Sequence, residues 1–154
     1  MVSAMSTDRM RELETLLARI RAAKNVLLNY DMWDSQGASH APDEVRARWE
    51  ADAASARSQL STTQAELEKQ VATTRASAPG EIAAWADAHD QYLAAFLAEC
   101  AAKGASADTA ASVASEERAG WHEVRDGKRA FVDENVFYVT LNAERYRTLF
   151  GVDP

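Results

Sequence analysis

The chain contains few of the residues that interrupt helices, with six glycines and three prolines among 154 residues. Alanine is the commonest residue, and it loses no side-chain entropy when it enters a helix. A scarcity of helix breakers together with abundant alanine argues against a fold rich in strands. The composition therefore predicts an all-α protein.

Cysteine and long apolar runs are also scarce. Because Cys100 is the single cysteine, no intrachain disulfide can form, which fits a reducing compartment. The longest apolar run, 92–97, is far shorter than the roughly 20 residues that span a bilayer. The first residues lack the basic and apolar pattern of a secretory signal. We expect a cytoplasmic protein outside the membrane, and the bias toward Ala, Arg and Asp is typical of bacteria.

Basic charge is in deficit, with 17 Lys and Arg against 24 Asp and Glu and a formal net charge of −7. Such a balance opposes nucleic-acid binding, because that binding depends on cations that neutralise phosphates. The stretch 81–100 has acidic residues and no Lys or Arg. It predicts either a solvated surface or an anionic face that steers a basic protein partner. Glu81, Asp87 and Asp90 are the candidate partner-binding residues of this face.

Helix start and stop signals divide the chain into four main helices within a single domain, 1–154. The expected helices cover 6–33, 42–76, 79–103 and 106–127. Pro42 and Pro79 open the second and third, since proline suits the first helical position. Ser106 is the expected N-cap of the fourth. The predicted fold is an all-α, four-helix bundle-like domain with long helices and a small irregular or β-containing C-terminal element.

The second helix carries apolar residues at an eleven-residue spacing, which keeps a stripe on one side of a straight helix. Two interleaved ladders follow this spacing: Val45, Ala56 and Leu67, and Trp49, Leu60 and Val71. The stripe predicts a seam between helices of one chain, or alternatively an interface between two copies.

The segment 129–151 is rich in aromatic residues. Residues 136–141 have the β-branched and aromatic character of a strand, to be paired with 130–132, and 143–150 is expected to form a short helix capped by Asn142. The aromatic side chains either close the end of the bundle or form a docking surface. The candidate docking residues are Phe137, Tyr138, Tyr146 and Phe150.

Motifs that carry chemistry are missing. The sequence has no Glu-x-x-His pair, no Gly-x-Ser-x-Gly elbow and no glycine-rich phosphate loop. We therefore predict no catalytic residue, no cofactor and no metal; His89, His122 and Asp126 are the weak candidates for metal ligands, with a packed core histidine as the alternative for His89. The four tryptophans, one in each main helix, are interpreted as core anchors, with a ligand cage as the alternative.

These observations predict a non-enzymatic, acidic helical module that binds a basic protein partner, such as a bacterial toxin-neutralising immunity protein or an adaptor. Two alternatives stay open. One is a self-assembling coiled-coil scaffold that forms a homodimer through the eleven-residue ladder. The other is a metal-dependent helical-bundle enzyme built on the histidines and nearby carboxylates.

Overall fold

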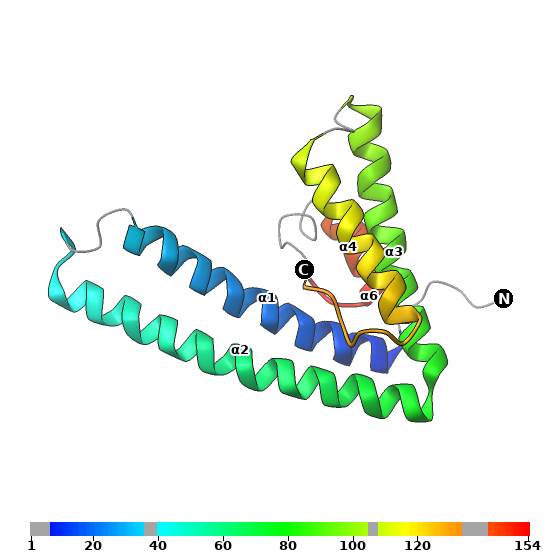
Figure 1. Cartoon of the computed structure of the whole chain (residues 1–154), viewed down its shortest axis with the longest axis horizontal. Helices are drawn as coiled ribbons and strands as arrows, with labels where there is room; N and C mark the ends of the chain where they lie inside the picture. Colours follow the sequence, from blue (N-terminus) through cyan, green and yellow to red (C-terminus); the bar gives the residue numbers. More distant parts are fainter. Residues whose placement is uncertain (1–6, 36–39, 105–107, 134–141) are drawn as a thin grey trace.

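The computed structural model describes residues 7–35, 40–104, 108–133 and 142–154, and within them the chain is all-α and bundle-like, without strands (Figure 1). None of the described helices combines the length and apolar character needed to cross a membrane. The helices are α1 (Asp8–Ser35), α2 (Asp43–Ser77), α3 (Pro79–Ala102), α4 (Thr109–Arg125) and α6 (Ala143–Phe150).

The four main helices lie within three residues of their predicted bounds, and α6 occupies the predicted range 143–150. Asn142 caps α6 as expected, because its side-chain oxygen accepts a hydrogen bond from the backbone N–H of Arg145. The expected cap Ser106 lies outside the described residues. Asp108 is the N-cap of α4, where its carboxylate accepts from the N–H of Ala110. The predicted strand 136–141 also lies outside the described residues, while 130–132 forms no strand.

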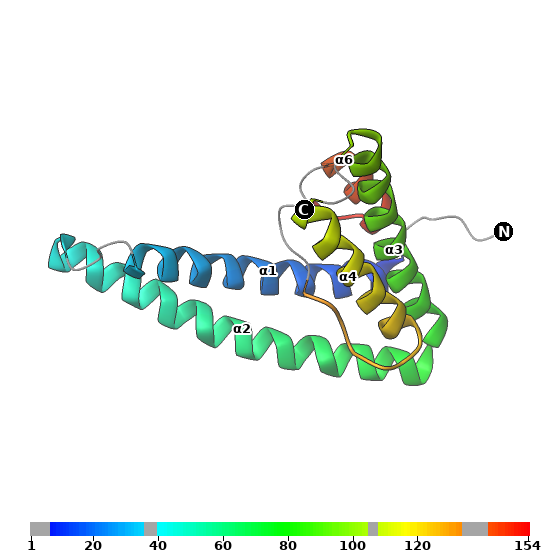
Figure 2. The same ribbon diagram turned by 45° about the horizontal axis from the view of Figure 1, so that its top comes forward.

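The first two helices run side by side along most of their length (Figures 1 and 2). The ladder of α2 faces this seam. Ala56, Leu67 and Val71 are buried, while Val45, Trp49 and Leu60 are partly buried. Because both ladders lie against α1, their side of α2 serves as a seam within the chain.

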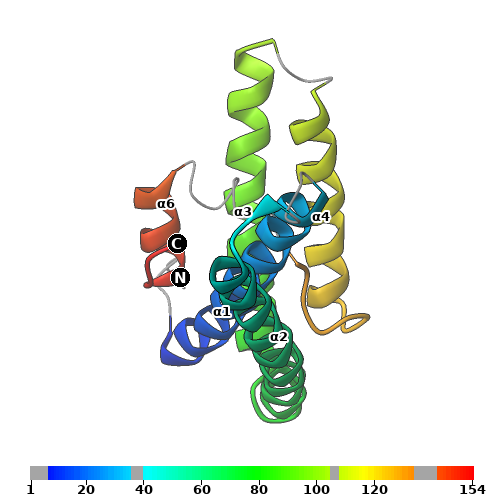
Figure 3. The same ribbon diagram turned by 90° about the vertical axis from the view of Figure 1, so that its left-hand side faces the viewer.

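The other three helices form a head at one end of the α1–α2 pair. α3 and α4 rise steeply away from that pair (Figure 1), and Figure 3 shows α3 flanked by α4 and by α6. The hydrophobic core lies where the head meets the first half of α1 and the last part of α2. Its largest fully buried side chains include Trp85, Trp121, Tyr92, Tyr146 and Phe150.

Beyond the head, α1 and α2 continue as a two-helix arm, which we define as residues 25–35 and 43–58. On α1 the core cluster extends no farther than Ile20. On α2, which runs in the opposite direction, Leu60 is the first residue in the sequence that packs against the core. The figures show the arm projecting from the head with its two helices beside each other (Figures 1 and 2). Among the described helices, each arm helix therefore has the other as its one neighbour, and much of its surface is exposed.

Gly120 marks a close approach between α4 and the segment that follows it. A Cβ atom at this position would lie 2.8 Å from Cγ2 of Val132, which is itself buried. We expect Gly120→Ala to lower the free energy of unfolding by about 1–3 kcal/mol through overpacking, partly offset by about 1 kcal/mol of helix propensity.

A matched substitution separates these two effects. A Cβ at Gly80, in the first turn of α3, would meet nothing within 4 Å. Gly80→Ala is therefore expected to raise stability by about 0.4–1 kcal/mol, because it restricts the unfolded chain only. Urea denaturation of both variants measures the difference in the free energy of unfolding. If Gly120→Ala were as stable as Gly80→Ala, the Val132 side chain could move aside without a cost in stability.

Candidate functional site: an aromatic pocket on the arm

The far end of the arm brings together three aromatic side chains. Trp33 of α1 meets Trp49 of α2 edge to face, with ring centroids 3.9 Å apart and an interplanar angle of 83°. Tyr30 lies one helical turn before Trp33, and their ring centroids are 5.7 Å apart. Edge-to-face contacts of this kind stabilise aromatic pairs beyond simple burial. The three rings thus join the two helices where the core of the head no longer reaches.

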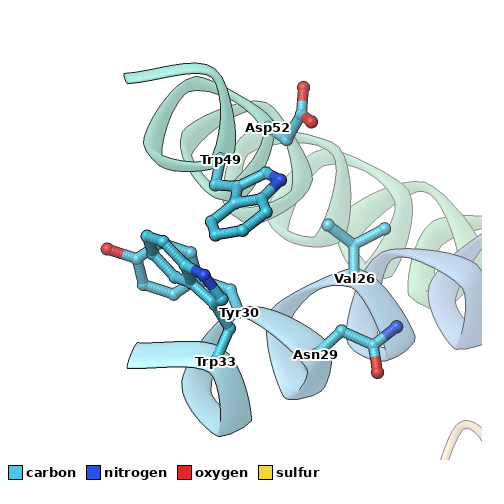
Figure 4. Close-up of a pocket in the computed structure, with 6 residues that line it drawn as sticks. All are labelled: Val26, Asn29, Tyr30, Trp33, Trp49 and Asp52. Atoms are coloured by element: carbon cyan, nitrogen blue, oxygen red, sulfur yellow. The ribbon is translucent and has the colours of Figure 1, made fainter. Parts of the chain in front are cut away.

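A pocket of about 310 Å³ opens beside these rings. Figure 4 shows Trp49 projecting from α2 toward α1, with Tyr30 and Trp33 on one side of the opening and Val26 and Asn29 on the other. Asp52 lies at the α2 edge, and its carboxylate points away from the rings (Figure 4). The walls are therefore mostly apolar and aromatic, with polar groups at the rim, as is typical of ligand sites.

The arm also carries the most exposed large apolar side chains among the described residues. Val26, Leu28 and Met32 are 40%, 57% and 51% exposed, and all three belong to α1. The two tryptophans of the arm remain partly exposed as well. Large apolar side chains gathered on one exposed element mark interaction surfaces more often than isolated ones do.

Charge on the arm is predominantly negative. It contains six Asp and Glu residues against three Arg, and all six acidic residues are exposed: Asp31, Asp34, Asp43, Glu44, Glu50 and Asp52. Arg46 forms an ion pair with Asp43, and the guanidinium of Arg57 lies 5.8 Å from the ring centroid of Tyr30. Two of the three cations thus have contacts within the arm. The arm that carries the pocket is therefore acidic, and Asp52 places one negative charge at the rim.

A second cluster of reactive side chains lies in the head and is buried. The carboxylate of Glu14 on α1 accepts hydrogen bonds from Trp85 Nε1 at 2.9 Å, His89 Nε2 at 2.7 Å and the Tyr146 hydroxyl at 2.5 Å. It also forms an ion pair with Arg21. All five side chains are at most 5% exposed. The cluster connects α1, α3 and α6 inside the protein, where solvent does not reach it.

Electrostatics keep Glu14 ionised within this cluster. Burial alone would raise its pKa, but His89 and Arg21, together with the hydrogen bonds from His89 and Tyr146, hold the pKa of the carboxyl well below its usual range. Burial and the neighbouring Glu14 carboxylate raise the pKa of Tyr146. Tyr146 therefore stays protonated and donates to Glu14. Structural ion-pair networks shift pKa values in the same way as active sites do, so the shifts alone do not identify this cluster as catalytic.

The acidic residues predicted on α3 meet cations of α4. Asp90 accepts from Arg118 Nε at 2.6 Å and from His122 Nε2 at 2.5 Å. Burial would raise the pKa of Asp90, but the hydrogen bonds and charges of Arg118 and His122 lower it.

Nearby, Asp87 lies 3.4 Å from Arg125, and Glu81 is partly buried in the first turn of α3. Asp87 and Asp90 therefore each have a cation of α4 beside them, which offsets part of the negative charge of this stretch. Their role in binding a partner stays a prediction.

The candidate metal ligands are not brought together. His89 contacts Glu14 and stacks on Trp121 with ring centroids 3.8 Å apart, which agrees with the packed core histidine. His122 binds Asp90, and Asp126 ends α4, where it lies 3.7 Å from Arg125. Across the part of the chain that the structure describes, no group of three or more His, Cys, Asp or Glu residues could hold a metal ion.

The candidate docking residues of the C-terminal segment divide in two. Phe137 and Tyr138 lie outside the described residues. Tyr146 and Phe150 are fully buried, with ring centroids 4.7 Å apart, so the docking interpretation is wrong for these two side chains. They close the head against α1 and α3, as the alternative interpretation predicts. Their spacing of four residues places both on the buried face of α6.

The tryptophans divide into two pairs. Trp85 and Trp121 are core anchors, fully buried with ring centroids 4.9 Å apart. Trp33 and Trp49 line the pocket on the arm, which sequence reasoning did not single out. The available signal was their position on either side of the loop between the first two predicted helices, where antiparallel pairing brings them together. No family model, no curated protein and no solved structure matches this chain.

Proposed function

We propose that this chain is a non-enzymatic protein-binding module and that the end of its arm docks on a basic partner protein. The observation that carries the proposal is the pocket between Trp33 and Trp49, open to solvent on a projecting element. Partly exposed Trp and Tyr side chains are the residues most enriched in binding hot spots. A two-helix projection can place them into a partner's groove without disturbing the head.

Acidic side chains around the pocket favour a partner of opposite charge. Asp52 lines the pocket, and the other carboxylates of the arm, among them Asp31 and Glu50, are exposed on the same two helices. Complementary charge raises association rates and excludes wrong partners. A second copy of this chain would bring the same negative surface against itself, which disfavours the alternative of a self-assembling scaffold.

The narrower roles that suit this module are a toxin-neutralising immunity protein or an adaptor in the bacterial cytoplasm. Both act by occupying a partner's surface, and neither needs a reactive group in contact with solvent. The reactive cluster around Glu14 lies within the core and contacts three helices, which supports a structural role for it. We therefore favour binding over the metal-dependent enzyme.

Selection from a displayed library of random peptides, with the full chain as bait, tests the proposal. Recovered peptides should be rich in Lys and Arg and should bind with micromolar dissociation constants in titration calorimetry. Raising the salt concentration from about 50 mM to about 300 mM should weaken them severalfold, because screening acts on exposed charges.

The control variant lies outside the arm. The double substitution Trp33→Ala and Trp49→Ala should abolish binding, whereas Gln59→Ala, at an exposed residue of α2 beyond the arm and the pocket, should not. Circular dichroism verifies that each variant keeps its helices. Peptides without excess positive charge, or peptides that bind the double variant equally well, would refute a basic partner at this site. A dimer in light scattering that the double substitution dissociates would favour the scaffold instead.

A further inference from the structure

We propose that the pocket on the arm holds one cationic side chain of the partner, that of an arginine, against the aromatic rings, with the carboxylate of Asp52 as a negative charge at the rim. This inference rests on the proposed function and names the chemical group that the pocket recognises. Its walls are built from Tyr30, Trp33 and Trp49 on two different helices, and Asp52 supplies a negative charge at the rim.

Aromatic faces attract cations because the ring quadrupole is negative above and below the plane, and tryptophan is the strongest of the three aromatic residues in this respect. Trp33 and Trp49 meet edge to face at 83°, so their planes are nearly perpendicular. Perpendicular rings present two faces in different directions. A planar guanidinium can therefore stack on one ring while its edge approaches the other.

The arm already shows this interaction with a cation of its own. The guanidinium of Arg57 lies 5.8 Å from the ring centroid of Tyr30, within the range of cation–π attraction. Arg57 belongs to α2, and it is not among the six residues that line the pocket. Tyr30 thus already contacts a cation of this chain that lies outside the pocket, and Trp33 and Trp49 line the pocket beside it.

Asp52 gives the rings a charge with which an arginine can pair. It is exposed at the α2 edge of the opening, where its carboxylate points outward (Figure 4). The other exposed acidic residues of the arm add a field of the same sign.

The pocket is large enough to hold one extended side chain. Its volume of about 310 Å³ lies at the lower end of the range of roughly 300–1,000 Å³ for ligand sites. Val26, 40% exposed, and Asn29 line the side of the opening away from Tyr30 and Trp33 (Figure 4). A side chain with an apolar stem and a charged head suits this combination of apolar wall and acidic rim.

The test uses short blocked peptides that differ only in their central residue: arginine, its neutral isostere citrulline, lysine or norleucine. Each is titrated into the full chain labelled with ¹⁵N, and the indole N–H signals of Trp33 and Trp49 are followed after assignment by single Trp→Phe variants. The arginine peptide should shift both signals in a saturable manner. The citrulline peptide should bind about tenfold more weakly, because it lacks the charge.

Two substitutions distinguish the contribution of the aromatic rings to binding from that of the charge at the rim. Trp49→Leu keeps an apolar side chain but removes the aromatic face, and it should weaken the arginine peptide about tenfold. Asp52→Asn should weaken it severalfold and reduce its dependence on salt. Gln59→Ala lies outside the arm and the pocket and should leave the dissociation constant unchanged.

Equal binding of the arginine and norleucine peptides would overturn the inference, since the pocket would then take an apolar anchor, while the proposed function would stand. An absence of shifts at Trp33 and Trp49 with every peptide would overturn it as well. In that case the displayed library decides separately whether the arm binds a basic protein at all.

Discussion

Glu14→Gln is expected to lower the free energy of unfolding by about 3–5 kcal/mol, because it removes the negative charge that compensates Arg21 inside the protein. Glutamine keeps the size of the side chain, so the loss reports charge and hydrogen bonding. The carboxylate accepts from groups on two further helices, Trp85 and His89 of α3 and Tyr146 of α6. Urea denaturation followed by circular dichroism measures the change.

Glu12→Gln is the matched control on the same helix. The Glu12 side chain is 62% exposed, and its ion pair with Arg9 spans 3.1 Å on the surface. Exposed pairs contribute about 0–1 kcal/mol, so this variant should keep nearly all of the wild-type stability. A loss for Glu14→Gln no larger than that of Glu12→Gln would contradict a structural role for the buried cluster.

Acid provides an independent measurement of the same group. The folded state lowers the pKa of Glu14, so the unfolded state binds more protons there, and the group stabilises the protein above its unfolded pKa of about 4.5. This contribution is lost as the pH falls from about 4.5 toward the lower folded value. The stability gap between the wild type and Glu14→Gln should therefore be full near neutral pH and narrow on acidification. If the free energies of unfolding of the two proteins changed in parallel with pH, Glu14 would not have the lowered pKa assigned to it.

The helix bounds could be predicted from the sequence because their signals are local. Pro42 and Pro79 lie at helix starts, and Asn142 and Gly151 enclose α6, with Gly151 in the left-handed conformation at φ 73°. The eleven-residue ladder likewise predicted the buried side of α2. Each of these signals acts over a few residues of one helix.

The buried cluster was not predicted, although α1 contains a signal for it. Glu14 and Arg21 are seven residues apart, which places them on one face with Leu17. Opposite charges within an apolar stripe indicate a buried ion pair, but the partners on α3 and α6 are set by tertiary packing. The cations beside the acidic stretch of α3 could not be foreseen for the same reason, since Arg118 and Arg125 lie on another helix.

The pocket depends on pairing between two helices over a long distance in the sequence. Trp33 and Trp49 come together only when α1 and α2 fold back on each other. Composition gives each tryptophan an apolar character that suits a core as well as a surface. A tryptophan on α1 or α2 is a core residue where the head covers it and a surface residue on the arm. The boundary between head and arm depends on how α3, α4 and α6 pack.

Phe150→Ala is expected to lower the free energy of unfolding by about 3–5 kcal/mol, the usual cost of truncating a fully buried phenylalanine. Its ring lies 4.3 Å from that of His89 and 4.7 Å from that of Tyr146, measured between centroids. The truncation leaves a cavity beside the Glu14 cluster, so α6 should loosen first.

Thr148→Ala tests the exposed face of the same helix. Thr148 donates a hydrogen bond to the backbone oxygen of Glu144, and its side chain is exposed. Alanine favours the helix at such a position, so stability should be unchanged or slightly raised. Hydrogen exchange of the α6 amides distinguishes the two variants, with faster exchange expected for Phe150→Ala. If Phe150→Ala retained wild-type stability, its ring would not be part of the core, and α6 would again be a candidate docking surface.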